Sequence, residues 1–150
     1  MPPPLLKFAD EAAYRQHFHA NYCTGAIMTH DGIPVYFDRW KFDHAFFESV
    51  AAKDDTFSLI RAERMDWIRL TLQDVGADRF QGWNKKTKTY EPHRRVEVVH
   101  EDFVVVLQIS RKRNGHLKAK FVTCYQADNS IGMIRQSPVW DRGACENALP

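Results

Sequence analysis

The side chains of this sequence that could carry chemistry are cations able to neutralise phosphate and groups able to move protons. They are His44, Arg61, Arg94, Arg95, Lys118, Lys120, Thr123 and Tyr125. RNA cleavage without a metal needs such a set: a base that activates the 2′-hydroxyl, an acid for the leaving oxygen, and cations for the developing negative charge. The composition permits this chemistry but does not single it out.

Other reaction classes have less support in the sequence. It contains no HExxH segment, no glycine-rich phosphate loop, no GxSxG and no acidic cluster suited to magnesium. His17 and His19 stand two residues apart on an expected helix, so they would not face each other. We therefore expect no metal site and no cofactor.

A helix over about Lys41–Ala52 is expected to position His44. Its buried stripe would consist of Phe42, Ala45, Phe46, Ser49 and Val50, which recur at helical spacing. At about 100° per residue, His44 lies about 200° from Phe42 and points away from the core. An outward histidine is either available for catalysis or an ordinary surface residue.

A second helix, over about Phe57–Val75, should carry Arg61 on the face of its apolar stripe. That stripe consists of Met65, Ile68, Leu72 and Val75, and Arg64 and Trp67 flank it. A buried guanidinium without a partner is costly, so Arg61 should reach solvent or lie beside an anion. The alternative is a solvent-directed side chain that pairs with Asp54, Asp55 or Glu63.

The segment Phe103–Tyr125 has the pattern of a β-hairpin with a short basic turn. In a regular strand, Thr123 and Tyr125 share one face, and Lys120 and Cys124 share the other. Lys120 could join the two hydroxyl side chains only if a β-bulge intervenes. A Cys124 that points to the helix-packed side would be a small core residue.

A basic stretch from Arg79 to Tyr90 precedes the hairpin and contains Lys85 and Lys86 among aromatic residues. Such a stretch could follow a nucleic-acid backbone through its cations while its rings stack on bases. The alternative is a solvated loop anchored by Trp83. Further lysines, on the second strand of the hairpin, have the same two interpretations: phosphate contact or a solvated strand face.

The order of elements, helices first and then strands joined by short turns, predicts an α+β domain with N-terminal helices packed on a small antiparallel β-sheet. The length of 150 residues favours a single domain. We expect the core at about residues 33–140, a peripheral helix at about residues 10–19 capped by Asp10, and a tail from Asp141 without regular structure.

The charge and the cysteine content bear on the kind of partner and on the cellular location to expect. A net charge of +2 and a pI near 8.5 permit an anionic partner without requiring one. Three cysteines without CxxC spacing disfavour a disulfide framework and a zinc cluster, so we expect a reducing, cytoplasmic location. We also expect no membrane association, because the sequence has neither a secretion signal pattern nor a stretch long enough to span a bilayer.

The order of three segments resembles the phage-associated branch of the Barnase-EndoU-Colicin-RelE (BECR) fold nucleases. The segments are VYFDRWKFDHAFFES, FSLIRAERMDWIRLTL and LKAKFVTCYQAD, and together they extend from Val35 to Asp128. They carry F-x-H-A-F, R-A-x-R-x-x-W-I and K-x-K-F-x-T-x-Y patterns. Cys124 departs from the small residue, such as alanine, that the family leads us to expect.

The resemblance implies a metal-independent endoribonuclease in a toxin, phage or mobile-element setting, acting on tRNA or another structured RNA. Its catalytic residues would be His44 as general acid or base, Arg61 as phosphate ligand, and the pair Thr123 and Tyr125. RNA would be held by Arg64, Lys85, Lys86, Arg94, Arg95, Lys118 and Lys120, and an immunity or antitoxin protein would be a partner.

Two alternatives stay open at this point. One is a non-catalytic module on the same fold that binds RNA or a protein. The other is an enzyme for small phosphorylated or nucleotide substrates.

Overall fold

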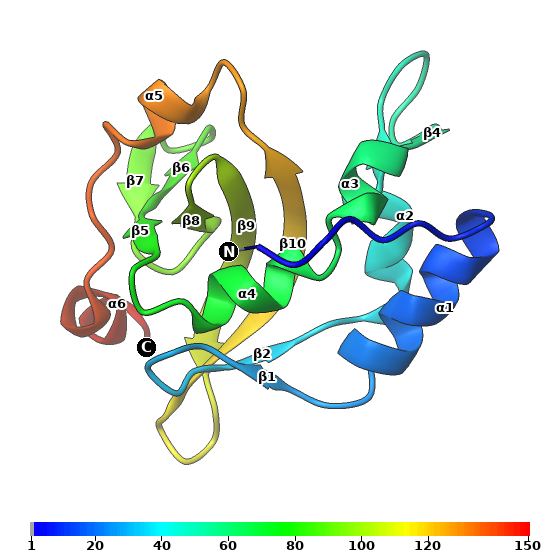
Figure 1. The fold of residues 1–150 in the computed structure, drawn as a ribbon. Coiled ribbons are helices and arrows are strands. Elements are labelled where there is room, and N and C mark those ends of the chain that lie inside the picture. The colour runs from blue at the N-terminus through cyan, green and yellow to red at the C-terminus, as the bar shows by residue number, and fades with distance from the viewer. Residues whose placement is uncertain (1) are drawn as a thin grey trace.

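A six-stranded β-sheet forms the centre of the molecule, which we describe for residues 2–150 of a computed structural model (Figure 1). In spatial order its strands are β1 (Ile27–Met28), β2 (Pro34–Tyr36), β10 (Leu117–Gln126), β9 (Phe103–Arg111), β8 (Val96–His100) and β5 (Asp78–Phe80). All neighbours are antiparallel except β2 and β10, which are parallel. The α+β class is confirmed, but the sheet is larger than expected and contains one parallel pair.

The long strands β9 and β10 form the predicted hairpin. Its turn contains Asn114 and Gly115, and Gly115 has a φ of +89°, which a glycine adopts without steric cost. Alternate residues of both strands are buried on the face that packs against helices, among them Val105, Leu107 and Phe121. This hairpin is therefore the scaffold against which the helices pack.

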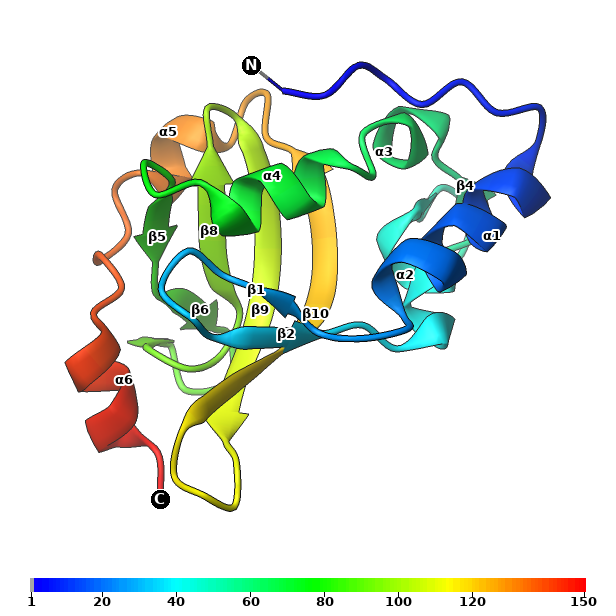
Figure 2. The same cartoon turned by 60° about the horizontal axis from the view of Figure 1, so that its bottom comes forward.

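The two helices expected between residues 41 and 75 are shorter than the sequence pattern predicts, whereas α1 extends beyond the expected residues 10–19. The helices are α1 (Glu11–Tyr22), η1 (Arg39–Lys41, a 3₁₀ turn), α2 (Phe42–Ala45), α3 (Leu59–Glu63), α4 (Trp67–Gln73), α5 (Ile131–Ile134) and α6 (Arg142–Ala148). Two small hairpins complete the fold: β3 (Phe47–Glu48) with β4 (Thr56–Phe57), and β6 (Gly82–Asn84) with β7 (Thr89–Glu91). Figure 2 shows α4 lying across β8 and β9.

The expected helix Lys41–Ala52 ends at Ala45 because its second half forms a hairpin loop. The Asp55 carboxylate accepts hydrogen bonds from the backbone N–H groups of Val50, Ala51 and Ala52. Aspartate side chains that bond to nearby backbone in this way compete with helix formation. Ser49 and Val50, assigned to the buried stripe, are consequently exposed.

The expected helix Phe57–Val75 is divided into α3 and α4. At the junction, the N–H groups of Arg64, Met65 and Trp67 bond to carbonyls three residues earlier, which is the tighter 3₁₀ pattern. Met65, Ile68 and Leu72 are buried as predicted, but Val75 lies beyond the end of α4 and is 81% exposed. The junction changes the direction of the chain, so α3 and α4 cover different parts of β10 and β9.

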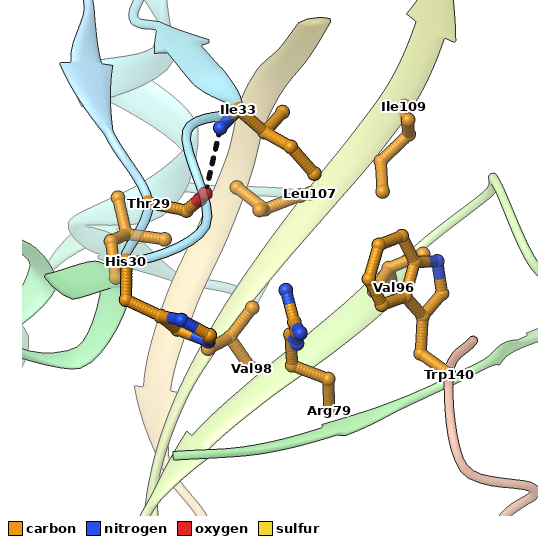
Figure 3. A pocket seen from close by; sticks show the side chains of 10 residues that line it. Thr29, His30, Ile33, Arg79, Val96, Val98, Leu107, Ile109 and Trp140 are labelled. Carbon is orange, nitrogen blue, oxygen red and sulfur yellow. Dashed lines mark hydrogen bonds between the residues drawn. The ribbon is translucent and has the colours of Figure 1, made fainter. Parts of the chain in front are cut away.

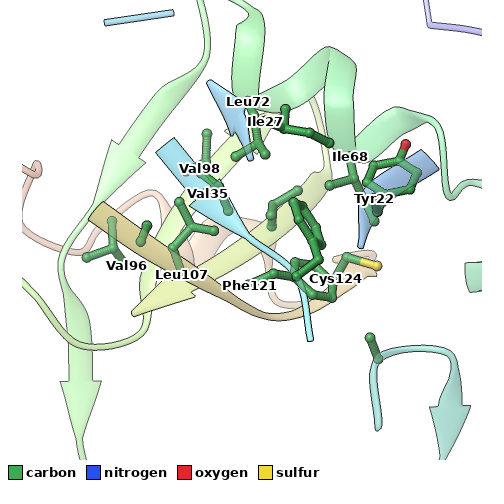
Figure 4. Packing of buried hydrophobic residues seen from close by; sticks show 14 of the residues in the cluster. Tyr22, Ile27, Val35, Ile68, Leu72, Val96, Val98, Leu107, Phe121 and Cys124 are labelled. Atoms are coloured by element: carbon green, nitrogen blue, oxygen red, sulfur yellow. The ribbon is translucent and has the colours of Figure 1, made fainter. Parts of the chain in front are cut away.

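Helix α1 is not peripheral, which corrects the expectation from the sequence. Asp10 caps it as predicted, since its carboxylate accepts a hydrogen bond from the N–H of Ala13. Tyr14, Phe18 and Tyr22, spaced four residues apart, are fully buried in the main core. Tyr22 lies there beside the side chains of the sheet (Figure 4). The aromatic stripe makes α1 part of the core because rings of this size bury a large apolar area.

The C-terminal segment also differs from the expectation. The tail from Asp141 forms α6, with Asp141 as its N-cap and Cys145 fully buried. On the sheet face opposite α1 to α4, a smaller apolar cluster is formed with α5 by Phe80, Val99, Val104, Val106, Ala127 and Ile134. Only part of that second face is therefore open to solvent.

Candidate active site

A β-bulge in β10 decides which side chains of this strand point toward the site. Phe121 pairs with Leu107 and Thr123 with Val106, so Val122 is left without a partner in β9. Because of this extra residue, each later side chain of β10 points to the opposite face from the one it would have in a regular strand. Phe121 and Cys124 both belong to the main core, although a regular strand would separate them.

The bulge corrects the expectation that Lys120 lies opposite Thr123 and Tyr125. Tyr125 packs against the smaller cluster of the second face, and the register partner of Thr123, Val106, belongs to that cluster. Lys120 pairs with the exposed Gln108 on the same face. Cys124 is a buried core residue whose thiol pKa is raised to about 12 by burial, so the thiol stays protonated near neutral pH.

One cleft of about 500 Å³ brings together the four residues expected to be catalytic. We call it the central cleft; it is lined by His44, Phe47, Glu48, Ser49, Asp54, Arg61, Arg95, Thr123 and Tyr125. β2 pairs with β10 only at Ala119 and Lys120, so α2 and α3, instead of a strand, lie beside the later half of β10 (Figure 1). The end of β2 thus leaves room for helix residues and strand residues to meet.

His44 is held by a carboxylate that the sequence interpretation did not assign to it. Its Nδ1 lies 2.9 Å from Oδ2 of Asp54. Because a carboxylate can only accept, this contact places a proton on Nδ1 and leaves Nε2 as the free ring nitrogen. The His44 side chain is 36% exposed, so Nε2 can be reached by a ligand in the cleft.

The β3–β4 loop fixes Asp54 in position. Asp54 has a φ of +51°, an uncommon value for a residue with a side chain, and its N–H donates to Oγ of Ser49 at 2.9 Å. The carboxylate of the next residue, Asp55, accepts hydrogen bonds from three backbone N–H groups of the same loop, each at 2.9 Å. The loop therefore presents Asp54 to His44 through its own internal hydrogen bonds.

We expect the Asp55 carboxyl to titrate well below an ordinary aspartate. The three N–H donors lower its pKa from 3.8 to about 2 because they stabilise the charged form. The stability that these bonds contribute is present above pH 3.8 and is lost as the pH falls through about 2. A ¹³C NMR titration should find the midpoint near 2, and a midpoint at 3.8 would contradict the loop structure.

Arg61 is anchored to backbone and is not neutralised by a carboxylate. Its Nη1 donates to the carbonyl of Phe47 at 3.0 Å and approaches that of Ala45 at 3.4 Å. Within residues 2–150, no carboxylate forms a salt bridge with Arg61. The alternative that Arg61 pairs with Asp54, Asp55 or Glu63 is therefore wrong. A guanidinium has five N–H donors, so those on Nε and Nη2 stay available to an anion in the cleft.

Tyr125 is tied to Glu97 of β8. Its hydroxyl donates to Oε2 of Glu97 at 3.1 Å. Burial and the Glu97 charge raise the pKa of Tyr125, so the hydroxyl keeps its proton. Burial also raises the pKa of Glu97, and the hydrogen bond from Tyr125 partly opposes that shift. The geometry makes Tyr125 a fixed wall of the central cleft with a polar edge.

Arg95 connects the central cleft to two neighbouring depressions. One is lined by Trp83, Asn84, Lys85, Lys86, Arg94 and Arg95. The other is lined by Asp38, Trp40, Lys41, Arg94, Arg95, Gln108, Lys120, Phe121 and Val122, and we call it the Lys120 depression. Gly82 supports this junction, because a Cβ there would lie 2.0 Å from the carbonyl oxygen of Arg94.

Two residues expected to bind RNA lie outside these surfaces. Arg64 donates to the carbonyl of Ile60 and its guanidinium lies 5.2 Å from the centre of the Trp67 ring. Lys118 stands near the start of β10, opposite Ser110 and before the bulge. Neither lines the central cleft or its neighbours.

The sequence interpretation missed Asp54 and Glu97 as parts of the site. Asp54 was considered only as one of three alternative partners for Arg61, and Glu97 was not considered. The signal for Glu97 was its place between Val96 and Val98, which sends it to the face opposite the core. No local signal pointed from Asp54 to His44, because their contact depends on the loop between β3 and β4.

A further hollow, of about 430 Å³, shares Tyr125 with the central cleft, and none of its lining residues is a cation; they are Trp83, Tyr90, Glu97, Tyr125, Ser130, Met133, Ile134 and Ser137. A space of only about 10 Å³ lies between Thr29, Ile33, Val98, Leu107, Arg79 and Trp140 (Figure 3). It is about the size of one water molecule, and Arg79 beside it is paired with Asp31 at 2.7 Å. Within residues 2–150, no group of three or more His, Cys, Asp or Glu side chains is arranged to hold a metal ion, and no helix is long and apolar enough to cross a bilayer.

Comparison of the chain with protein-family models, with curated proteins and with solved structures found no match.

Proposed function

We propose that the protein is a metal-independent endoribonuclease of the BECR type. The observation that carries the proposal is the meeting of an oriented histidine, an unneutralised arginine and two hydroxyl side chains in one cleft. These side chains come from α2, α3 and β10. Core packing alone does not require outward residues from separate elements to converge, whereas catalysis does.

The chemistry assigns a role to each group in the central cleft. With an RNA phosphate beside Arg61, the 2′-hydroxyl attacks phosphorus and the bond to the 5′-oxygen of the next nucleotide breaks. The products are a 2′,3′-cyclic phosphate and a free 5′-hydroxyl: the 2′-oxygen loses one proton and the leaving 5′-oxygen gains one. His44 Nε2 carries out one of these two transfers, as general base or as general acid, with Asp54 holding the ring.

The remaining groups position the phosphate. Nε and Nη2 of Arg61 neutralise the charge that develops on the non-bridging oxygens. The Thr123 hydroxyl binds a phosphate oxygen, and Tyr125, held by Glu97, fixes the neighbouring nucleotide by stacking or hydrogen bonding. A tRNA or other structured RNA target, a toxin, phage or mobile-element setting, and an immunity partner follow from the family resemblance as predictions.

The test is RNA cleavage by the purified chain in excess EDTA. We expect labelled RNA to be cut into fragments that end in 2′,3′-cyclic phosphate and begin with 5′-hydroxyl, as read by mass spectrometry. A substrate with 2′-O-methyl groups throughout should be bound and left intact. Cleavage of that substrate, or cleavage only after metal is restored, would contradict the proposal.

A non-catalytic RNA-binding module is the second candidate. It is favoured by one observation: cleavage needs both an acid and a base, and His44 is the only imidazole that lines the central cleft, so the second group would have to be a carboxylate such as Glu48. Salt-sensitive binding of RNA without any cleavage would favour this module.

A further inference from the structure

Beside the central cleft, the Lys120 depression has the features of a second binding site. It has a volume of about 330 Å³ and shares Arg95 with the central cleft. Four of its lining residues are cations, Lys41, Arg94, Arg95 and Lys120, and one is a carboxylate, Asp38. Asp38 lies 3.6 Å from the Lys120 ammonium. One carboxylate leaves most of this positive charge without a partner.

Lys41 shows what the surplus of positive charge does locally. The pKa of its ammonium is lowered by burial, and the charges of Lys120 and Arg95 lower it further, while Asp38 opposes them. Like charges that face one another are destabilising unless an anion lies between them. A phosphate group in the depression would relieve this repulsion.

Trp40 adds an aromatic surface to the same depression. It is 63% exposed, and the Lys41 ammonium lies 4.4 Å from the centre of its ring. By contrast, Trp83 in the other depression already packs against Tyr90, with ring centres 5.0 Å apart. The exposed Trp40 ring is therefore the better platform for a further planar group, such as an unpaired base.

We infer that the Lys120 depression is a subsite for a nucleotide flanking the scissile phosphate, with Lys41 and Lys120 on its phosphate and Trp40 on its base. The substrate class is then single-stranded RNA, or a loop of structured RNA, that crosses Arg95 between the two sites. A base inside a duplex is stacked on its neighbours and cannot lie on Trp40. The inference rests on the proposed function, since it places a neighbouring nucleotide of that same substrate.

The test measures binding separately from cleavage. His44→Ala is the background, so that the RNA stays intact, and a fluorescein-labelled decauridylate is titrated by anisotropy at several salt concentrations. Adding Lys41→Gln and Lys120→Gln should reduce the slope of log K against log salt by about 0.7, the value for the one phosphate that the two lysines share. Adding Trp40→Leu should weaken decauridylate binding by about tenfold.

The matched control is Lys112→Gln with Arg113→Gln in the β9–β10 turn, at the end of β10 far from Tyr125 (Figure 1). It removes the same charge and should leave the salt slope unchanged. Lys120→Gln alone, at a largely exposed side chain, should give about half the effect of the pair and guards against misfolding of the double variant.

Several results would overturn the subsite. One is a reduction of the salt slope in the control variant equal to that in the Lys41 and Lys120 variant. The others are duplex RNA that binds as tightly as single-stranded RNA, and polyglutamate that competes with the labelled RNA as strongly as unlabelled RNA does. Cleavage by the native chain is measured in parallel. If RNA is not cut but the slope changes as expected, the nuclease proposal fails, and with it the assignment to a nucleotide beside a scissile phosphate, so that only RNA binding in the Lys120 depression remains. If RNA is cut and the slope does not change, the subsite fails alone.

Discussion

Replacing His44 with alanine is expected to lower the rate of RNA cleavage by about a thousandfold while leaving the fold intact. The ring is half-exposed, and its one hydrogen-bond partner is Asp54, so its loss removes a proton-transfer group and little packing. The rate is measured with a labelled RNA at saturating concentration, and thermal unfolding is followed by circular dichroism.

The partner variant Asp54→Asn separates orientation from proton transfer. An amide can donate to Nδ1 and so favour the wrong tautomer, which should lower the rate by about tenfold or more without changing RNA binding. His116→Ala, in the exposed β9–β10 turn, is the control for loss of an imidazole. Full activity of His44→Ala would remove the histidine from the mechanism.

Replacing Arg61 with alanine is expected to lower the cleavage rate by about a hundredfold to a thousandfold, because the phosphate loses its nearest unpaired donors. Arg61→Lys should recover only part of this loss. A lysine keeps the charge, but its compact ammonium cannot bond to the Phe47 carbonyl and to a phosphate in the planar arrangement of a guanidinium.

Arg61 also supports the β3 segment through its backbone contacts, so stability must be measured with activity. Each lost hydrogen bond contributes about 0.5–1.5 kcal/mol to the free energy of unfolding. The control is Arg69→Ala in α4, which likewise donates to a backbone carbonyl, that of Asn21, but lies outside the cleft. A rate loss in Arg69→Ala equal to that in Arg61→Ala would assign the effect to the scaffold and not to the phosphate.

The parts of the fold that could be predicted were those with a local signal. The hairpin pattern over Phe103–Tyr125, with its short basic turn, marked β9 and β10, and the Asp10 cap marked the start of α1. The outward direction of His44 was also predictable, because it depends only on its spacing from Phe42 and Ala45. These features need no knowledge of distant residues.

The parts that could not be predicted depend on contacts that span the chain or on competition within a loop. The parallel pairing of β2 with β10 joins segments more than 80 residues apart. The break after Ala45 follows from the bonds of Asp55 to three backbone N–H groups, which override a good helical pattern. Asp54 reaches His44 only because that loop forms.

The unpaired Val122 makes the site depend on the bulge itself as well as on the side chains around it. If residues 117–126 formed a regular strand without the bulge, Thr123 and Tyr125 would share the core face of Phe121, and the Cys124 thiol would turn toward the cleft. A deletion of Val122 would have a different result, because Thr123 would then follow Phe121 directly and the faces of Thr123, Cys124 and Tyr125 would be kept. A related sequence with one residue fewer between the Lys120 and Tyr125 positions should therefore keep the same site on a strand that has no bulge.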